Sequence, residues 1–128
     1  MNNQQRPLSP FMLGPYYRPQ LTSMMSIAHR ASGVVLSVLG APLFLWWLVA
    51  LGSGPEAYRT LLRFFDSWVG QAALAVTALC LSYHFLNGIR HLVWDTGRAL
   101  DLRSAYTGGW LVLIVTVIAT AALLGIVL

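Results

Sequence analysis

Two histidines able to do chemistry stand in a stretch of the chain that otherwise suits a lipid bilayer. His84 lies inside the uncharged segment 67–89, and His91 follows two helical turns later. At 100° per residue, the polar and small residues within roughly 60° of His84 form one stripe on a helix. They are Thr77, His84, Asn87, Gly88, His91 and Asp95. An imidazole at membrane depth is costly to keep, so it generally ligates a metal, relays a proton or binds a polar partner.

The spacing of the two histidines favours a large ligand. His84 and His91 are ~10 Å apart along a helix axis, too far for both to ligate one metal ion. A haem would fit, with its iron on His84 and its propionates reaching toward the interface where His91 lies. Gly88 would leave space beside the helix for a flat macrocycle. From the residues alone, an interhelical hydrogen bond remains the alternative for His84.

A second polar cluster stands where the first apolar segment begins. Ser26, His29, Arg30 and Gly33 follow the i, i+3, i+4, i+7 pattern of one helix face. Arginine supplies a fixed charge and forked donors suited to a haem propionate or a quinone oxygen, and Ser26 can donate a further hydrogen bond. The cluster therefore predicts a site for an anion or a carbonyl group.

The elements that must position these residues are membrane helices. Hydrophobic residues make up 57% of the chain and charged residues only 9%, against about 25% charged in soluble domains. The uncharged runs 31–54, 67–89 and 107–128 each meet the roughly 20 residues that a spanning helix needs. We expect an all-α fold: one membrane-anchor domain over residues 1–128, a bundle of three transmembrane helices at approximately 26–52, 67–94 and 107–128.

The arginines predict the orientation of this bundle. Six of the eight basic residues flank the first span on its N-terminal side or lie at and after the end of the second, and only Arg59 and Arg63 fall between these spans. The positive-inside rule then places the N-terminus in the cytoplasm. The basic charge reports topology and headgroup contact, so we expect no nucleic-acid partner. Arg90, well off the His84 stripe, is expected to snorkel to headgroups.

The segments outside the spans have distinct patterns. Residues 1–22 form a proline-rich cytoplasmic leader that we expect to run extended. Between the first two spans, apolar and charged residues fall on opposite faces of a short predicted helix on the outer membrane surface. Its apolar face holds Tyr58, Leu61, Leu62 and Phe65, and its polar face holds Arg59, Arg63 and Asp66. The single cysteine, Cys80, is interpreted as packing in the second span.

Three blocks of the chain resemble a known family. They are the leader motif Arg6-Pro7-Leu8-Ser9-Pro10, the block Ser26-Ile27-Ala28-His29-Arg30-Ala31-Ser32-Gly33, and the block from His84 to Asp95 containing Gly88-Ile89-Arg90-His91. The chain is similar over nearly its whole length to the cytochrome b subunits of succinate dehydrogenase. This subunit is the larger membrane anchor of succinate:quinone oxidoreductase, or respiratory complex II.

The resemblance implies specific roles. His84 matches the axial ligand of haem b iron, with the second axial histidine coming from the smaller anchor subunit. Ser26 and Arg30 match residues of the ubiquinone site, and His29, Arg30 and His91 match residues near the haem propionates. Relatives often carry a histidine where this chain has Phe11, so no role transfers to that position.

The resemblance also implies partners and a location. A flavoprotein subunit and an iron-sulfur subunit pass electrons from succinate to ubiquinone at the anchor, in the tricarboxylic acid cycle and respiratory chain. The chain alone would not oxidise succinate. The expected location is the bacterial inner membrane, or the mitochondrial inner membrane in a eukaryote.

Two other functions stay open on the residues. One is a haem-free membrane scaffold or proton-relay subunit that uses the His84 stripe. The other is a self-contained cytochrome in which a symmetric homodimer supplies the second axial histidine, since the third span has none.

Overall fold

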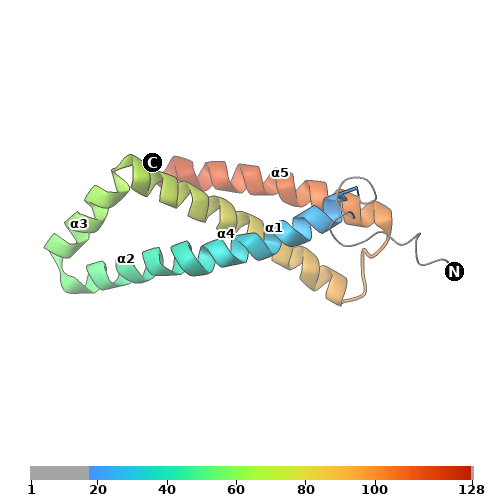
Figure 1. Cartoon of the computed structure of the whole chain (residues 1–128), viewed down its shortest axis with the longest axis horizontal. Helices are drawn as coiled ribbons and strands as arrows, with labels where there is room; N and C mark the ends of the chain where they lie inside the picture. The colour runs from blue at the N-terminus through green and yellow to red at the C-terminus, as the bar shows by residue number, and fades with distance from the viewer. Residues whose placement is uncertain (1–17, 128) are drawn as a thin grey trace, which may run out of the picture.

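The computed structural model describes residues 18–127, and all regular elements among these residues are helical. In chain order they are α1 (Leu21–Val35), the π-helical turn η3 (Leu36–Gly40), α2 (Ala41–Ser53), α3 (Pro55–Phe65), α4 (Trp68–Asp95) and α5 (Leu102–Val127). Three long rods run lengthwise through the molecule, and α3 joins two of them at one end (Figure 1). We call this the α3 end. The other, where α1 and α5 begin and α4 finishes, is the histidine end.

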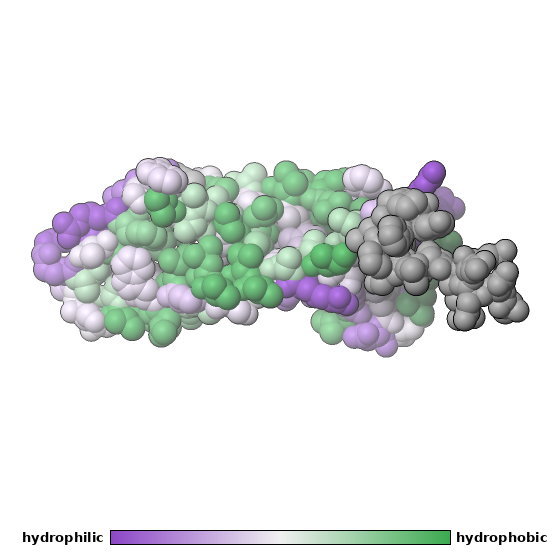
Figure 2. Space-filling view, in the orientation of Figure 1, coloured by the Kyte–Doolittle hydropathy of each residue, from purple (hydrophilic) through white to green (hydrophobic). Residues whose placement is uncertain are grey.

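Three rods are long and apolar enough to cross a membrane: Leu21–Ser53, Trp68–Asp95 and Leu102–Val127. Apolar side chains cover much of the middle of the visible surface, and polar ones gather toward its ends (Figure 2). This is the distribution that a bilayer selects. The expected all-α bundle of three membrane helices is confirmed. The cytoplasmic placement of the N-terminus stays a prediction.

The first rod contains a wide turn in its middle. In η3 the hydrogen bonds skip one residue further back than in an α-helix, so the amide of Ala41 donates to the carbonyl of Leu36. Pro42 follows immediately, and proline in a regular helix clashes with the carbonyl four residues earlier. A π-helical turn offers a way to absorb that clash without breaking the span. Gly40 lies here against Thr77 of α4.

The α3 end depends on two glycines. Gly54, between α2 and α3, has φ of 101°, which L-residues with a side chain rarely adopt. Gly70 follows the turn into α4, and a Cβ there would lie 2.0 Å from the carbonyl oxygen of Phe64. The Ser67 hydroxyl caps α4 by accepting from the Gly70 amide at 3.2 Å.

The helix α3 is amphipathic, as its pattern predicts. Leu61 is 1% exposed, while Arg59 and Glu56 form an exposed ion pair at 2.7 Å on the polar face. This arrangement suits a helix lying at a membrane surface.

The core lies toward the histidine end. Met25, Tyr83 and Val112, one residue from each rod, form the buried apolar cluster. The Tyr83 hydroxyl donates to the backbone carbonyl of Met25 at 2.7 Å. Since few groups can replace such a bond in lipid, it sets the register of α1 against α4. The predicted extended leader falls almost wholly in residues 1–17, outside the described residues, and α1 begins at Leu21.

Candidate functional site: an imidazole cluster between α1 and α4

His84 is held by one edge of its ring. Its Nδ1 atom lies 3.1 Å from the backbone carbonyl oxygen of His29 and 3.1 Å from the hydroxyl oxygen of Ser32. Ser32, only 6% exposed, itself donates to the His29 carbonyl at 2.8 Å. Two groups on α1 therefore grip a ring on α4.

These contacts assign the proton on the ring. A carbonyl oxygen can only accept, so Nδ1 of His84 must be the donor. The Ser32 proton already points to the same carbonyl, which leaves the Ser32 oxygen free to accept from Nδ1 as well. The neutral imidazole therefore carries its proton on Nδ1, and Nε2 keeps its lone pair. Nε2 makes no hydrogen bond within residues 18–127.

The two helices approach closely at this point. A Cβ on Gly33 would lie 3.0 Å from Cε1 of His84, so a larger residue would displace the ring. The ring of His29 stacks on that of His84 with centroids 4.0 Å apart and planes 8° apart. Stacking covers a face of the His84 ring and leaves the edge that bears Nε2 uncovered by it.

A third imidazole joins from the next turns of α4. His91 meets the His29 ring edge-on at 5.1 Å between centroids, and its Nε2 lies 3.3 Å from Nδ2 of Asn87. Arg90 donates to Oδ1 of Asn87, also at 3.3 Å. Because arginine only donates, the amide orientation is determined: Asn87 presents its NH2 group to His91, and Nε2 of His91 must accept.

Arg90 does not snorkel to the membrane surface along a lipid-exposed face of α4, as its helical angle predicted. It is 7% exposed, and it donates to the carbonyl oxygen of Ala105 at 2.7 Å across the α4–α5 contact. Its guanidinium also lies 4.0 Å over the ring of Trp94. The expectation was wrong because α5 covers the face of α4 that a single-helix projection assigns to lipid.

Three further positions of the predicted stripe have different surroundings. The space beside Gly88 is taken by His29, whose Cε1 would lie 3.8 Å from a Cβ there, so Gly88 accommodates an imidazole. Thr77 lies on the same stripe but away from the imidazoles, against Gly40. Asp95 is exposed, and it forms no ion pair with Arg98 or any other described residue.

The quinone-site candidates lie beside this cluster rather than within it. Arg30 is exposed and Ser26 is half-buried. Neither side chain forms a hydrogen bond to another residue of the described range. Of the four residues predicted to share a face, His29 and Gly33 turn toward α4, and Arg30 remains available to a ligand outside the bundle.

Sequence reasoning missed Ser32 as a residue of the candidate site, although it lies three residues after His29 and so on a neighbouring part of the same face.

The side chains that could ligate a metal ion directly are few. Within residues 18–127 no three histidine, cysteine or acidic side chains come together to hold a metal ion.

Comparisons with known proteins identify the family of this chain. Residues 2–123 match the family model for the succinate dehydrogenase/fumarate reductase transmembrane subunit. The chain belongs to this family. The succinate dehydrogenase cytochrome b556 subunit of Rickettsia typhi is 31% identical, with 93% of this chain and 90% of the relative covered.

Other members of the succinate dehydrogenase family show the same relationship. The cytochrome b556 subunit of Paracoccus denitrificans is 38% identical, covering 83% of this chain and 79% of its own length. The cytochrome b560 subunit of Marchantia polymorpha is also 38% identical, with 84% and 80% covered. The resemblance found in the sequence motifs is thus confirmed, and the chain is a membrane subunit of a succinate dehydrogenase complex.

Proposed function

We propose that this succinate dehydrogenase subunit binds haem b through Nε2 of His84 and helps to reduce ubiquinone at its histidine end. The observation that carries the proposal is the pair of contacts on Nδ1. A metal-bound histidine typically donates its other ring N–H to a carbonyl or hydroxyl, which fixes the tautomer and the ring orientation. His84 has both partners, the His29 carbonyl and the Ser32 hydroxyl.

The neighbouring imidazoles fit the carboxylate groups of a haem. Nδ1 of His29 is buried and has no hydrogen-bond partner in the described part of the chain. His91 accepts at Nε2, so its proton is on Nδ1, where it can be donated. Buried polar nitrogens without partners are costly, and propionate oxygens would satisfy them. When bound, the haem would supply a centre that accepts and donates single electrons, and a smaller anchor subunit would contribute a second histidine.

Ubiquinone would be reduced next to this cluster, close to the iron-sulfur subunit that receives electrons from the flavoprotein subunit. Ser26 would donate a hydrogen bond to one quinone oxygen. Arg30 would stabilise the negative charge that builds on the quinone during electron transfer, because its guanidinium carries a positive charge and several N–H donors. Both residues lie near the start of α1, where protons can arrive from water and the apolar product can leave into lipid.

A proton relay is supported less well by the same contacts. A relay needs a continuous chain of hydrogen bonds, whereas His29 and His84 meet face to face as stacked rings. A ring stack orients the imidazoles without offering a path for a proton. The contact between His29 and His91 is likewise ring to ring.

The proposal is tested by a redox difference spectrum of the purified complex. His84→Leu should remove or shift the reduced b-type absorbance band, because leucine has no lone pair for iron. Thr77→Val is the control, since Thr77 shares the helix face of His84 but lies against Gly40, away from the imidazoles. An unchanged spectrum in His84→Leu, or a wild-type complex with no porphyrin, would overturn the assignment in favour of a haem-free scaffold.

A further inference from the structure

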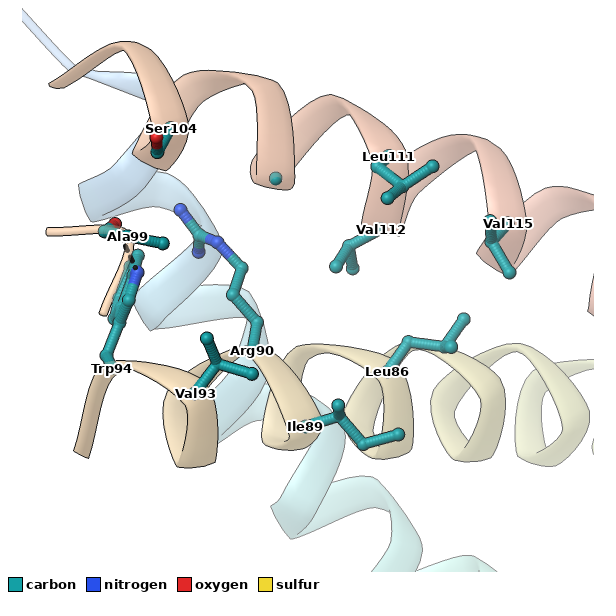
Figure 3. Close-up of a pocket in the computed structure, with 11 residues that line it drawn as sticks. Leu86, Ile89, Arg90, Val93, Trp94, Ala99, Ser104, Leu111, Val112 and Val115 are labelled. Atoms are coloured by element: carbon teal, nitrogen blue, oxygen red, sulfur yellow. Dashed lines mark hydrogen bonds between the residues drawn. The ribbon is translucent and has the colours of Figure 1, made fainter. Parts of the chain in front are cut away.

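A second site lies on the opposite face of α4. A cavity of about 340 Å³ opens between α4 and α5, and its walls change character along its length (Figure 3). One end holds Arg90, Trp94 and Ser104, while the other is formed by Leu86, Leu111 and Val115. On the helix projection, Leu86 lies roughly 160° from His84, so the apolar end of the cavity faces away from the imidazole cluster. At the polar end, Arg90 reaches that cluster only through Asn87.

The charge at the polar end is incompletely matched. Arg90 is 7% exposed, and its bonds go to neutral groups, the amide of Asn87 and the carbonyl of Ala105. Its Nε is buried and has no partner in residues 18–127. The α5 residue beside Nε is Gly108, whose absent Cβ would lie 3.6 Å away. No side chain of Gly108 therefore stands between that nitrogen and an incoming oxygen atom.

The dimensions of the cavity match one leaflet of a bilayer. From Ser104 to Val115, α5 rises ~16 Å, and half of the hydrocarbon core is ~15 Å. The polar end lies where Arg98 and Arg103 also stand, at the histidine end of the bundle. Basic pockets between membrane helices at such an interface bind anionic lipid headgroups.

We propose that this cavity binds one anionic phospholipid. An acyl chain lies along Leu86, Leu111 and Val115, and the phosphate accepts a hydrogen bond from Nε of Arg90 over Gly108. A quinone tail would fit the apolar walls equally well, but a neutral quinone head would leave the guanidinium charge unmatched, so the charge selects the phosphate. This proposal uses the face of α4 away from His84 and does not depend on the haem or quinone assignments.

The test counts lipids retained by the intact complex in native mass spectrometry. The complex is incubated with dioleoylphosphatidylglycerol or with zwitterionic dioleoylphosphatidylcholine, then washed. Val115→Trp fills the apolar end of the cavity and should lose one phosphatidylglycerol per copy of this chain. Ile114→Trp, at the same depth, 56% exposed and outside the cavity lining, should retain it. Quinone reduction should be unchanged in both variants.

The headgroup is tested separately. Arg90→Gln should lower the preference for phosphatidylglycerol over phosphatidylcholine by roughly fivefold, the effect of one basic residue at the membrane surface. If Arg90→Gln does not assemble, the comparison between Val115→Trp and Ile114→Trp decides. Equal retention in these two variants, equal retention of both lipids by the wild type, or recovery of a quinone from the cavity would each overturn the proposal.

Discussion

The two ends of the bundle are held together by different physics. At the histidine end, hydrogen bonds join the helices, and several of them end on backbone carbonyls, as with Tyr83 on Met25 and Arg90 on Ala105. At the α3 end, aromatic rings join α2 to α3, with the Trp46 ring centroid 5.1 Å from that of Phe64 and 6.4 Å from that of Phe65.

Hydrogen bonds at the histidine end fix how the helices are oriented relative to one another. Aromatic contacts at the α3 end hold helices together without fixing a single orientation. A hydrogen bond has a direction and a short range of good distances, whereas aromatic contacts allow several geometries at similar energy. A site that must hold a ligand within a fraction of an ångström therefore belongs where hydrogen bonds join the helices.

The largest difference is expected between two exposed arginines, one at each end of the bundle. If Arg30 stabilises the quinone as proposed, Arg30→Leu should lower quinone reduction by about 10²–10³-fold, because it removes the positive charge opposite the developing anion. Succinate oxidation with an artificial dye acceptor should be retained. Arg63→Leu, an exposed arginine at the α3 end, should leave both rates unchanged. Parallel loss of both activities in Arg30→Leu would point to failed assembly instead of a quinone role.

A smaller effect is expected at the His84 ring edge. Ser32→Ala should weaken haem retention by about tenfold, near the lower limit for loss of such a partner, because the His29 carbonyl still holds Nδ1. Ser37→Ala is the matched control, since the Ser37 hydroxyl also bonds to a carbonyl of its own helix, that of Gly33, but does not touch His84. Haem titration of the apo-complex measures both. Identical haem affinity in the two variants would show that Ser32 only packs.

The two ends should also differ in how much a substitution lowers the stability of the fold. Asn87 is 0% exposed, and Asn87→Leu should cost about 1–3 kcal/mol because the buried Arg90 and His91 each lose a partner. Phe64→Leu should cost about 1 kcal/mol by loss of ring contacts. Thermal unfolding of the purified complex gives both values. Only Asn87→Leu should also alter the haem spectrum, and a spectral change in Phe64→Leu would show that the ends are coupled.

The smallest effect concerns the loop that leads into α5. The Asp101 carboxylate accepts from the backbone amide of Ser104 at 3.0 Å, and this bond lowers the pKa of Asp101 below its ordinary value. A depressed folded-state pKa stabilises the fold above the unfolded pKa of about 3.9, and the contribution disappears as pH falls through the lowered value. The melting temperatures of wild type and Asp101→Asn should therefore differ at neutral pH and converge in acid. A difference that is constant with pH would exclude the ionised cap.

Much of this architecture follows from the sequence, and the limits have a physical origin. Helix number and type could be predicted because a bilayer demands long apolar helices. The amphipathic pattern around Tyr58 to Phe65 likewise predicted α3. The prominence of His84 followed from the cost of an imidazole in lipid.

The pairing of faces could not be predicted in the same way. A helical projection shows which residues share a face but not which neighbour covers it. Arg90 was therefore assigned to headgroups, although α5 buries it. Ser32 carried no signal of its own, because a serine in a membrane helix usually bonds to the backbone of its own helix. Ser32 does so, and its hydroxyl also contacts His84.

One of the two contacts that hold the His84 ring is to a backbone atom, which every residue type supplies. The carbonyl oxygen of His29 belongs to the main chain, so substitution at position 29 leaves it in place as long as α1 keeps its path. Evolution is thus free to exchange the side chain that stacks on the ring while the ring's aim is inherited with the helix. Relatives that differ at position 29 should then keep the same orientation of the imidazole at position 84.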